Sequence, residues 1–346
     1  MQADVDALMA GELGQWLAAQ EAARKAAREK AMTRWTWGAA LALFPIAFAW
    51  LGPNWFGSWR IVITAVIALG VSAWGYHPIA EATKAIKVGI NSAIAKSFGL
   101  SYAHDVETGR EFTLAKTYGL IPDFDRKDLE DRWYGALEGH SFNLYEAHLE
   151  ERRGSGKNRR WVTVFRGAVI DMEFGRDFRS TTLLQRAGAH RKWLGLGGAK
   201  DSVRFKGHEL GRIDQVHPAF EDTFDLYGDD PVEARVLAHP SYVEHLLALE
   251  QAFKGDAVRA LFHRGQVVIA VETGRLFESG SMDAASDRDK VERAATQFAS
   301  LARLALAINQ NERGRAMGSA SSPDPADQGQ SSGLRNSGSG FGRKRR

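Results

Sequence analysis

Two apolar stretches near the N-terminus constrain the fold of this chain more than any other feature. No residue from Trp35 to Leu51 is charged, and the stretch from Ile61 to Ala80 is interrupted by only four polar residues, Thr64, Ser72, Tyr76 and His77. Each stretch is about 17 to 20 residues long, close to the length that an α-helix needs to cross a hydrocarbon core. A turn-rich connector, Gly52 to Arg60, joins them. The pattern predicts a two-helix transmembrane hairpin over residues 35–80.

Tryptophans mark the ends of both apolar stretches, and we interpret them as membrane-interface anchors. Indole rings prefer the headgroup level of a bilayer because they are apolar with one polar edge. A buried hairpin of a soluble protein would not need aromatic residues at its ends and would show a polar stripe on one helix. The anchors are Trp35, Trp37, Trp50, Trp55, Trp59 and Trp74.

The flanking charges predict the orientation of the hairpin. Five basic residues lie between Arg24 and Arg34, three more follow the second stretch, and the connector holds only Arg60. Positive charge collects on the cytoplasmic side, so we expect both termini in the cytoplasm of a bacterium and a multi-pass protein of its inner membrane. A cleaved signal peptide is the alternative, but the long acidic lead before the first stretch disfavours it.

The segments next to the hairpin have helical patterns. Residues 1–34 are rich in helix formers, and we expect a cytoplasmic helix that either binds a partner or is a solvated extension of the first span. In residues 81–99, an amphipathic linker helix, Ile86, Ile90 and Ile94 recur at four-residue intervals. Its apolar face could lie on the lipid surface or pack on the folded body.

Residues 100–312 alternate between strand and helix patterns and predict one α+β globular domain. The fold class is thus α+β: an N-terminal two-helix transmembrane hairpin, one mixed α+β domain and a disordered tail. Apolar β-formers separated by glycine-rich turns predict hairpins, and the final helix has an apolar face at steps of three and four residues. The predicted strands are 142–149, 161–165, 168–174, 181–184, 203–205, 220–227, 257–263 and 266–271, and the predicted helices are 231–238, 240–253 and 289–311.

Residues 313–346 form a basic tail that is too polar to bury a core, so disorder is predicted. This tail contains seven basic and two acidic residues, and because the whole chain has a net charge of +3, the remainder sums to about −2. A body with this charge gives no argument for nucleic acid, and nucleic acid is not an expected partner. The tail is a candidate for contact with anionic lipid.

Motifs for chemistry are absent from the sequence. There is no cysteine, no His-Glu-x-x-His and no Gly-x-Ser-x-Gly. The carboxylates from Asp123 to Asp131 alternate with basic residues and indicate the start of a charged helix, and Asp229-Asp230-Pro231 indicates a helix entry. We therefore predict no catalytic, cofactor-binding or metal-binding residue and no cofactor.

Two blocks of residues resemble the bacterial family called domain of unknown function 3137. The first contains Asp125, Arg126, Glu146 and the run Phe165-Arg166-Gly167; the second contains Phe220, Phe224 and the run Asp230-Pro231-Val232-Glu233-Ala234-Arg235. The resemblance covers roughly residues 115–280 and implies an N-terminal membrane hairpin with a cytoplasmic domain. It implies no reaction, ligand or catalytic residue.

Three functions remain open at this point. The first is a binding or scaffolding module on the cytoplasmic face of the inner membrane, with the lipid bilayer and an unidentified protein as partners. The second is a membrane-tethered enzyme that uses carboxylates near Asp125 and Asp230. The third is a lipid-surface sensor that works through the 79–98 helix and the basic tail. The sequence does not indicate whether the chain forms a homo-oligomer.

Overall fold

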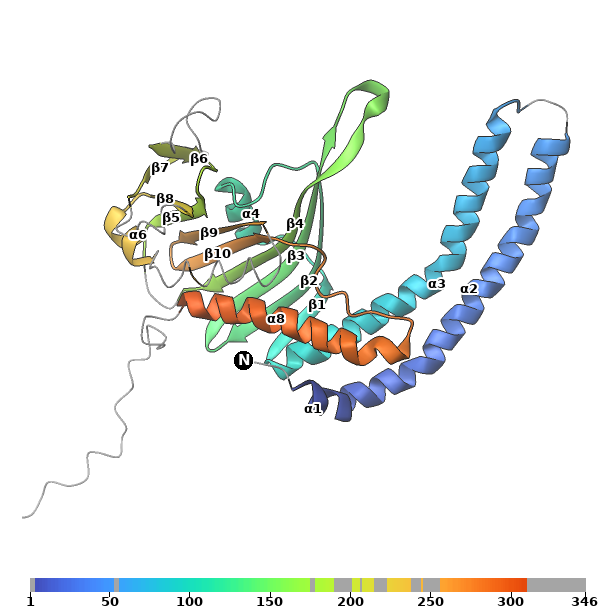
Figure 1. Ribbon diagram of the computed structural model, residues 1–346, viewed down its shortest axis with the longest axis horizontal. Helices are drawn as coiled ribbons and strands as arrows, with labels where there is room; N and C mark the ends of the chain where they lie inside the picture. Colours follow the sequence, from blue (N-terminus) through green and yellow to red (C-terminus); the bar gives the residue numbers. More distant parts are fainter. Residues whose placement is uncertain are drawn as a thin grey trace, which may run out of the picture.

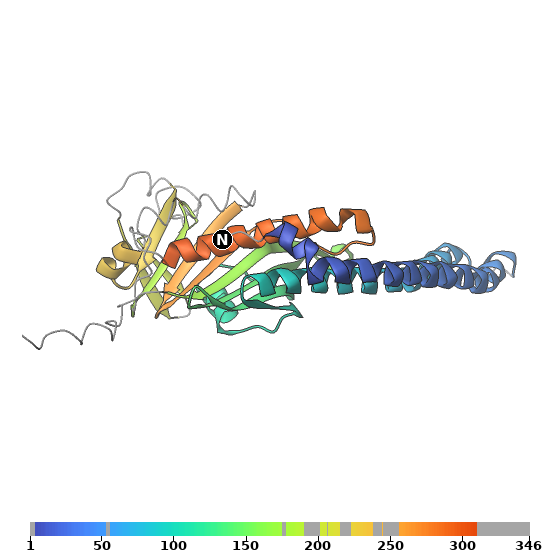
Figure 2. The same cartoon turned by 90° about the horizontal axis from the view of Figure 1, so that it is seen from below.

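The computed structural model describes residues 4–52, 56–174, 178–189, 201–205, 207–214, 223–237, 244 and 256–309. A short helix, α1 (Val5–Ala10), leads into two long helices, α2 (Glu12–Leu51) and α3 (Trp59–Ser97). The long helices run antiparallel, side by side, and extend as a rod beyond the sheet domain (Figures 1 and 2). The predicted helix within residues 1–34 is therefore the first part of α2.

The long helices contact each other closely. The Arg34 Nη1 donates to the Trp74 carbonyl at 3.2 Å, and Trp50 Nε1 donates to Thr64 Oγ1 at 3.0 Å. Gly75 permits the close approach, because a Cβ at this position would lie 2.0 Å from the Trp35 ring.

The structure supports one of the two predicted spans. Of the described helices, α3 is the one that is long and apolar enough to cross a membrane, and only 11% of its most apolar part is buried. A core helix of a soluble protein would be mostly buried. The apolar part of α2 begins after Arg34, which leaves it shorter than the roughly 20 residues of a typical span.

A ten-stranded antiparallel sheet forms the centre of the domain (Figure 1). The strand order is β1-β2-β3-β4-β10-β9-β5-β8-β7-β6. The strands are β1 (Leu100–Asp105), β2 (Arg126–Leu137), β3 (His140–Arg153), β4 (Arg160–Glu173), β5 (Thr181–Arg186), β6 (Ser202–Phe205), β7 (His208–Arg212), β8 (Phe224–Gly228), β9 (Asp256–His263) and β10 (Gln266–Glu272).

Helices cover both faces of this sheet. One face packs against α8 (Asp287–Asn309), the N-terminal part of α2 and the C-terminal half of α3, with Trp133 stacked on Phe298 at 4.5 Å between ring centroids. The other face packs against α4 (Arg110–Thr117). A further helix, α6 (Pro231–Leu237), follows β8. This arrangement confirms the mixed α+β class.

The amphipathic part of α3 packs on the domain. Ile86, Ile90 and Ile94 are buried in the core together with Leu13 and Leu17 of α2. Of the two alternatives for the linker helix, the structure thus shows packing on the body. The first part of α2 also packs on the domain through Leu13 and Leu17, while most of its other residues are exposed.

Residues 273–286, which we call the strap, connect β10 to α8 and hold both long helices. Asn91 of α3 donates to the Phe277 carbonyl at 3.3 Å, and Arg28 of α2 donates to the Met282 carbonyl at 2.7 Å. Arg24 of α2 forms a buried bidentate pair with Asp287, the first residue of α8, at 3.0 and 2.6 Å. Paired buried charges of this kind fix the geometry of the elements that carry them.

Several predicted elements are confirmed and one is wrong. The hairpins β3–β4 and β9–β10, and the helices α6 and α8, lie where the sequence predicts them. The charged run that ends at Arg132 was predicted to begin a helix, but it forms β2, in which Leu129 and Trp133 are buried on opposite faces of the sheet. The predicted helix 240–253, apart from Glu244, and the tail 313–346 lie outside the described residues.

Candidate functional site

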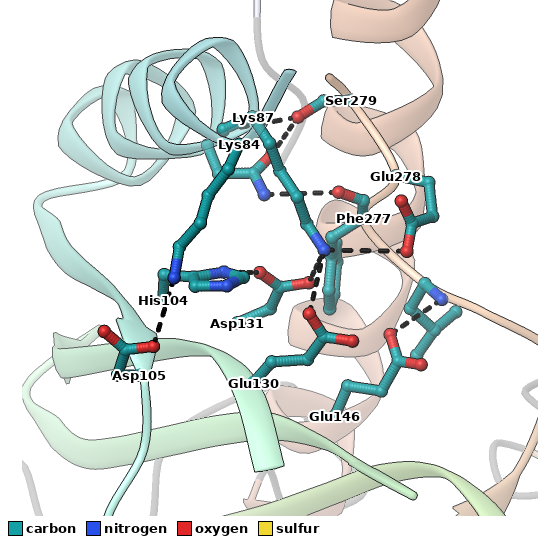
Figure 3. Close-up of polar contacts among 12 residues, drawn as sticks. Lys84, Lys87, His104, Asp105, Glu130, Asp131, Glu146, Phe277, Glu278 and Ser279 are labelled. Carbon is teal, nitrogen blue, oxygen red and sulfur yellow. Dashed lines mark hydrogen bonds and ion pairs between the residues drawn. The ribbon is translucent and has the colours of Figure 1, made fainter. Parts of the chain in front are cut away.

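Polar side chains gather where α3 meets the sheet and the strap, in a region otherwise made of apolar contacts (Figure 3). We call this group the junction cluster. Its members come from α3, β1, β2 and the strap. They are Lys87, Asn91, Tyr102, His104, Glu130, Asp131, Glu278 and Ser279.

Lys87 and Asp131 form the centre of the junction cluster. The Lys87 Nζ lies 2.7 Å from Asp131 Oδ2, and the two side chains are 8% and 0% exposed. The same Nζ lies 3.2 Å from Glu130 Oε2 and 3.6 Å from Glu278 Oε1. One ammonium group therefore faces three carboxylates from two different elements.

Burial and the neighbouring charges shift the pKa of both Lys87 and Asp131. Burial alone would lower the pKa of Lys87, but the carboxylates of Asp131, Glu130 and Glu278 outweigh it and raise that pKa. Burial raises the pKa of Asp131 in spite of the attraction of Lys87. The two side chains are thus coupled, because each lowers the cost of burying the other as an ion.

A local irregularity of β2 turns Asp131 toward α3. The register between β2 and β3 shifts between Glu130 and Trp133, and Asp131 has a φ of 61°. Such bulges re-aim a side chain relative to its neighbours. Asp131 Oδ1 then accepts a hydrogen bond from the Tyr102 hydroxyl at 2.5 Å and lies 3.3 Å from His104 Nδ1.

The strap closes the junction cluster from the side of α8. Ser279 Oγ donates to Asn91 Oδ1 at 2.8 Å, while the Phe277 N–H donates to Gln297 Oε1 of α8 at 3.1 Å. Phe277 has a φ of 53°, in the left-handed region that a non-glycine residue rarely adopts. The surrounding contacts therefore hold the strap in one strained conformation.

Glu146 of β3 is a second buried carboxylate close to the junction cluster (Figure 3). Its Oε2 accepts the Leu276 N–H of the strap at 2.9 Å, and its Oε1 lies 3.3 Å from Arg166 Nε. Burial raises the pKa of Glu146 to about 7, although both of these partners act to lower it. This carboxylate therefore changes charge near neutral pH.

His104, Glu130 and Asp131 place candidate metal-ligand atoms within 4.8 Å of one another. Nitrogen and carboxylate oxygen are common ligands for divalent cations. However, the Lys87 ammonium already lies against both carboxylates, so a cation would have to displace it. The geometry is that of an ion-pair network that joins α3, β2 and the strap.

The predicted motif residues of the first block have structural contacts. Asp125 Oδ2 accepts the Arg152 N–H at 2.8 Å, and Arg126 forms an ion pair with Glu150. Phe165 is buried in the core. At Gly167 a Cβ would lie 1.9 Å from the Val271 carbonyl oxygen, so glycine is required where β4 meets β10.

The second block builds the start of α6. Asp230 Oδ1 accepts the N–H groups of Val232 and Glu233 at 2.9 and 3.0 Å, and Glu233 Oε2 accepts the Ser180 N–H at 2.9 Å. Burial would raise the pKa of Glu233, but the hydrogen bonds from Ser180 and Arg179 lower it. Phe224 and Ala234 are buried, and Arg235 Nε donates to the Asp214 carbonyl at 3.3 Å.

Two second-block residues, Asp230 and Glu233, line an open cleft of about 730 Å³ together with Phe178, Arg179, Ser180 and Asp229. Phe220 lies outside the described residues. The carboxylates of Asp230 and Glu233 in this cleft already accept backbone N–H groups.

The structure does not bring Asp125 and Asp230 together. Asp125 immediately precedes β2, and Asp230 follows β8, which is six strands away in the sheet order. At about 4.8 Å between neighbouring strands, this separation is roughly 30 Å. The two carboxylates cannot act on one substrate group.

The predicted interface tryptophans lie on the rod. Trp37, Trp50, Trp59 and Trp74 are exposed, whereas Trp35 packs against Gly75. Trp55 lies outside the described residues. The sequence prediction missed the junction cluster, although the polar pair Lys87 and Asn91, one turn apart beside a buried isoleucine stripe, was a signal for it.

Comparison with known proteins confirms the resemblance to the family. Residues 163–310 match the family described as "Protein of unknown function (DUF3137)". No curated protein matches the chain. The crystal structure of the mycobacterial trehalose monomycolate transport factor A, TtfA, is similar over 63% of this chain and 95% of that chain, with 13% identity and a TM-score of 0.31. At this TM-score the likeness carries no argument about the present chain.

Proposed function

We propose that this protein is a membrane-anchored binding or scaffolding module: α2 and α3 cross a bacterial inner membrane twice, and the sheet domain lies on the cytoplasmic face. The observation that carries the proposal is the surface of the rod. Large apolar side chains that are exposed to solvent concentrate there, namely Trp37, Leu41, Leu43, Phe44, Phe48, Trp50, Leu51, Trp59, Ile61, Val62, Val66, Leu69, Trp74 and Tyr76. Soluble monomers rarely expose a continuous apolar surface of this size.

The dimensions of the helices support this proposal. α2 has 40 residues and α3 has 39. At a rise of 1.5 Å per residue each helix is about 60 Å long, which is twice the thickness of a hydrocarbon core. The half near the connector is free for lipid, and the other half packs on the domain.

The charges favour the cytoplasmic side for the domain. Arg24 to Arg34 of α2 and Lys84 to Lys96 of α3 lie on the domain side of the rod, and Arg60 is near the far end, over the Trp50 ring at 4.8 Å. This distribution follows the positive-inside rule.

Single cysteines test the topology, because the natural chain contains none. We suggest S58C near the connector, T33C at the domain end of α2 and S141C in the domain, each labelled with a membrane-impermeant maleimide. In intact spheroplasts S58C should react, while T33C and S141C should react only after permeabilisation. Reaction of T33C but not S141C in intact spheroplasts would show that only α3 crosses, and reaction of S141C would place the domain outside.

The motif carboxylates are engaged in the fold itself, which supports a binding role over an enzyme that uses them. Asp125, Glu146, Asp230 and Glu233 each accept backbone N–H groups that shape the fold. Affinity purification of the full chain from detergent-solubilised membranes, with an unrelated two-span protein as control, should yield one partner at a fixed ratio. Recovery of the chain with no specific partner, together with turnover of a small molecule by the purified chain, would contradict this role.

A further inference from the structure

The β3–β4 hairpin extends beyond the sheet. β2 pairs with β3 as far as Glu150, and β10 pairs with β4 as far as Gly167. Beyond these points the two strands pair with each other from Glu151↔Val162 to Arg153↔Arg160. We call residues 151–162 the finger. It is a two-stranded projection with solvent on both faces at its tip.

The finger is strongly basic and exposed. Every residue from Arg152 to Trp161 is exposed. Within the described residues, four of its basic side chains have no ion pair, in contrast to Arg153, whose Nε lies 2.8 Å from Glu151. These four are Arg152, Lys157, Arg159 and Arg160. The body as a whole is slightly acidic, so the positive charge of the finger is a local feature.

A tryptophan accompanies these charges. Trp161 is 44% exposed, and its ring is held by the Arg126 guanidinium, 4.8 Å from the ring centroid. Exposed tryptophan beside basic residues is the combination that favours a membrane interface, because the ring enters the headgroup layer while the cations meet phosphates.

The direction of the finger relates it to the rod. Figure 1 shows the finger (light green) leaving the sheet toward the same side as the free halves of α2 and α3. In this view the finger rises beside these halves, so a rod that crosses the bilayer at a tilt brings the finger tip to the headgroup layer on the domain side. Its charges would stop in the headgroup layer, because arginine and lysine do not enter hydrocarbon without a large cost.

The geometry points to the finger as a second membrane contact, which binds the anionic headgroups of the bilayer that α2 and α3 cross. This inference rests on the proposed function, since it requires the rod to be in the membrane. The finger and the rod would together fix the tilt of the domain over the surface. The opposite surface charge makes an anionic bilayer the partner that the finger fits.

The test uses the full chain in lipid nanodiscs. A fluorophore on S155C reports the finger tip, and the same fluorophore on S141C reports the far end of β3. The lipid carries a quencher on its headgroup, and discs of phosphatidylcholine alone are compared with discs that also contain phosphatidylglycerol. In anionic discs the S155C label should be quenched several-fold more than the S141C label. The difference should shrink between about 0.05 M and about 1 M salt, since salt screens these charges.

The matched variant replaces the four unpaired basic residues by glutamine, R152Q/K157Q/R159Q/R160Q. It should lose the quenching of the S155C label while it remains embedded with unchanged circular dichroism. Equal quenching of S155C with and without anionic lipid, or in the variant, would overturn the inference. So would an unquenched S155C label in an embedded chain, as expected if the finger binds an acidic protein or nucleic acid. A chain that does not enter the discs at all would overturn the proposed function and this inference together.

Discussion

Lys87 brings a positive charge into the contact between α3 and the sheet, where burial would otherwise favour an apolar residue. Its ammonium group faces Asp131, Glu130 and Glu278. Proteins often tolerate the replacement of a whole buried ion pair by two apolar residues. Loss of only one member leaves an uncompensated buried charge. The consequence is a residue whose removal should be far more damaging than that of other lysines on the same helix.

We predict that Lys87→Met destabilises the protein by about 3–5 kcal/mol, because Asp131 loses its partner. The melting temperature in detergent, followed by circular dichroism, should fall by roughly 10 °C. Lys84→Met is the matched control, since Lys84 and Asp105 form an exposed pair and the loss should be at most about 1 kcal/mol. The double variant K87M/D131N should recover part of the loss. Equal effects of K87M and K84M would contradict the buried network.

Glu146 should make stability depend on pH. Its pKa is raised from 4.5 to about 7 by burial. Between these values the folded protein keeps a proton that the unfolded chain has lost, so the free energy of unfolding falls as pH rises through this window and is lowest above it. Glu146→Gln cannot ionise, so its stability relative to the natural protein should increase across the window by up to about 3 kcal/mol.

Denaturant unfolding of both proteins at several pH values measures this difference. Glu138→Gln, in the turn between β2 and β3, is the control and should keep the natural profile. A constant difference between E146Q and the natural protein at all pH values would show that Glu146 does not titrate there.

At the residue scale, the sequence carries a sign of the α3 half of the junction cluster, Lys87 and Asn91, but none of the β2 half. Asp131 sits in a run of alternating charges that indicates the start of a charged helix, and its partner Lys87 is on another element. Two facts that only the fold supplies join them: the bulge in β2 that gives Asp131 a φ of 61°, and the packing of Ile86 and Ile90 that brings α3 over β1 and β2.

Among the elements, the contact between α2 and α3 depends on small residues. A Cβ added to Gly75 would lie 2.0 Å from the Trp35 ring, whereas a Cβ added to Gly70 of the same helix would meet no atom within 4 Å. We predict that Gly75→Ala destabilises the helix pair by about 1–3 kcal/mol because the ring must move. Gly70→Ala should be neutral or stabilise by up to about 1 kcal/mol.

Thermal unfolding of both glycine variants in the same detergent measures the effect. If G75A and G70A have the same melting temperature, the two helices pack less closely in the membrane protein than in the structure.

Local patterns predicted some elements well and others poorly. The β3–β4 and β9–β10 hairpins were predictable because apolar alternation and a glycine turn occur together, and α8 because its apolar face is regular. β2 was not, since its outward residues are charged and one inward residue is Asp131. The strand order of the sheet depends on pairing between distant segments, which sequence periodicity does not encode.

For the whole molecule, the rod and the domain should respond differently to a new charge. Leu69 on α3 is 71% exposed and Val232 on α6 is 72% exposed. Leu69→Arg places a cation in the predicted span at a cost of about 3 kcal/mol, so less of the chain should remain in carbonate-washed membranes. Val232→Arg should leave the membrane fraction unchanged. Equal retention of the two variants in carbonate-washed membranes would argue against lipid around the rod.

The unbroken course of α3 has a mechanical consequence. One helix of 39 residues carries both the apolar surface and the core residues Ile86, Ile90 and Ile94, with Pro78 inside it and no flexible linker between the two parts. A piston shift or a twist imposed on the span would therefore be transmitted to Lys87 and, through Asp131 and the strap, to β2 and α8. The helix would carry such a movement to the domain as one continuous element.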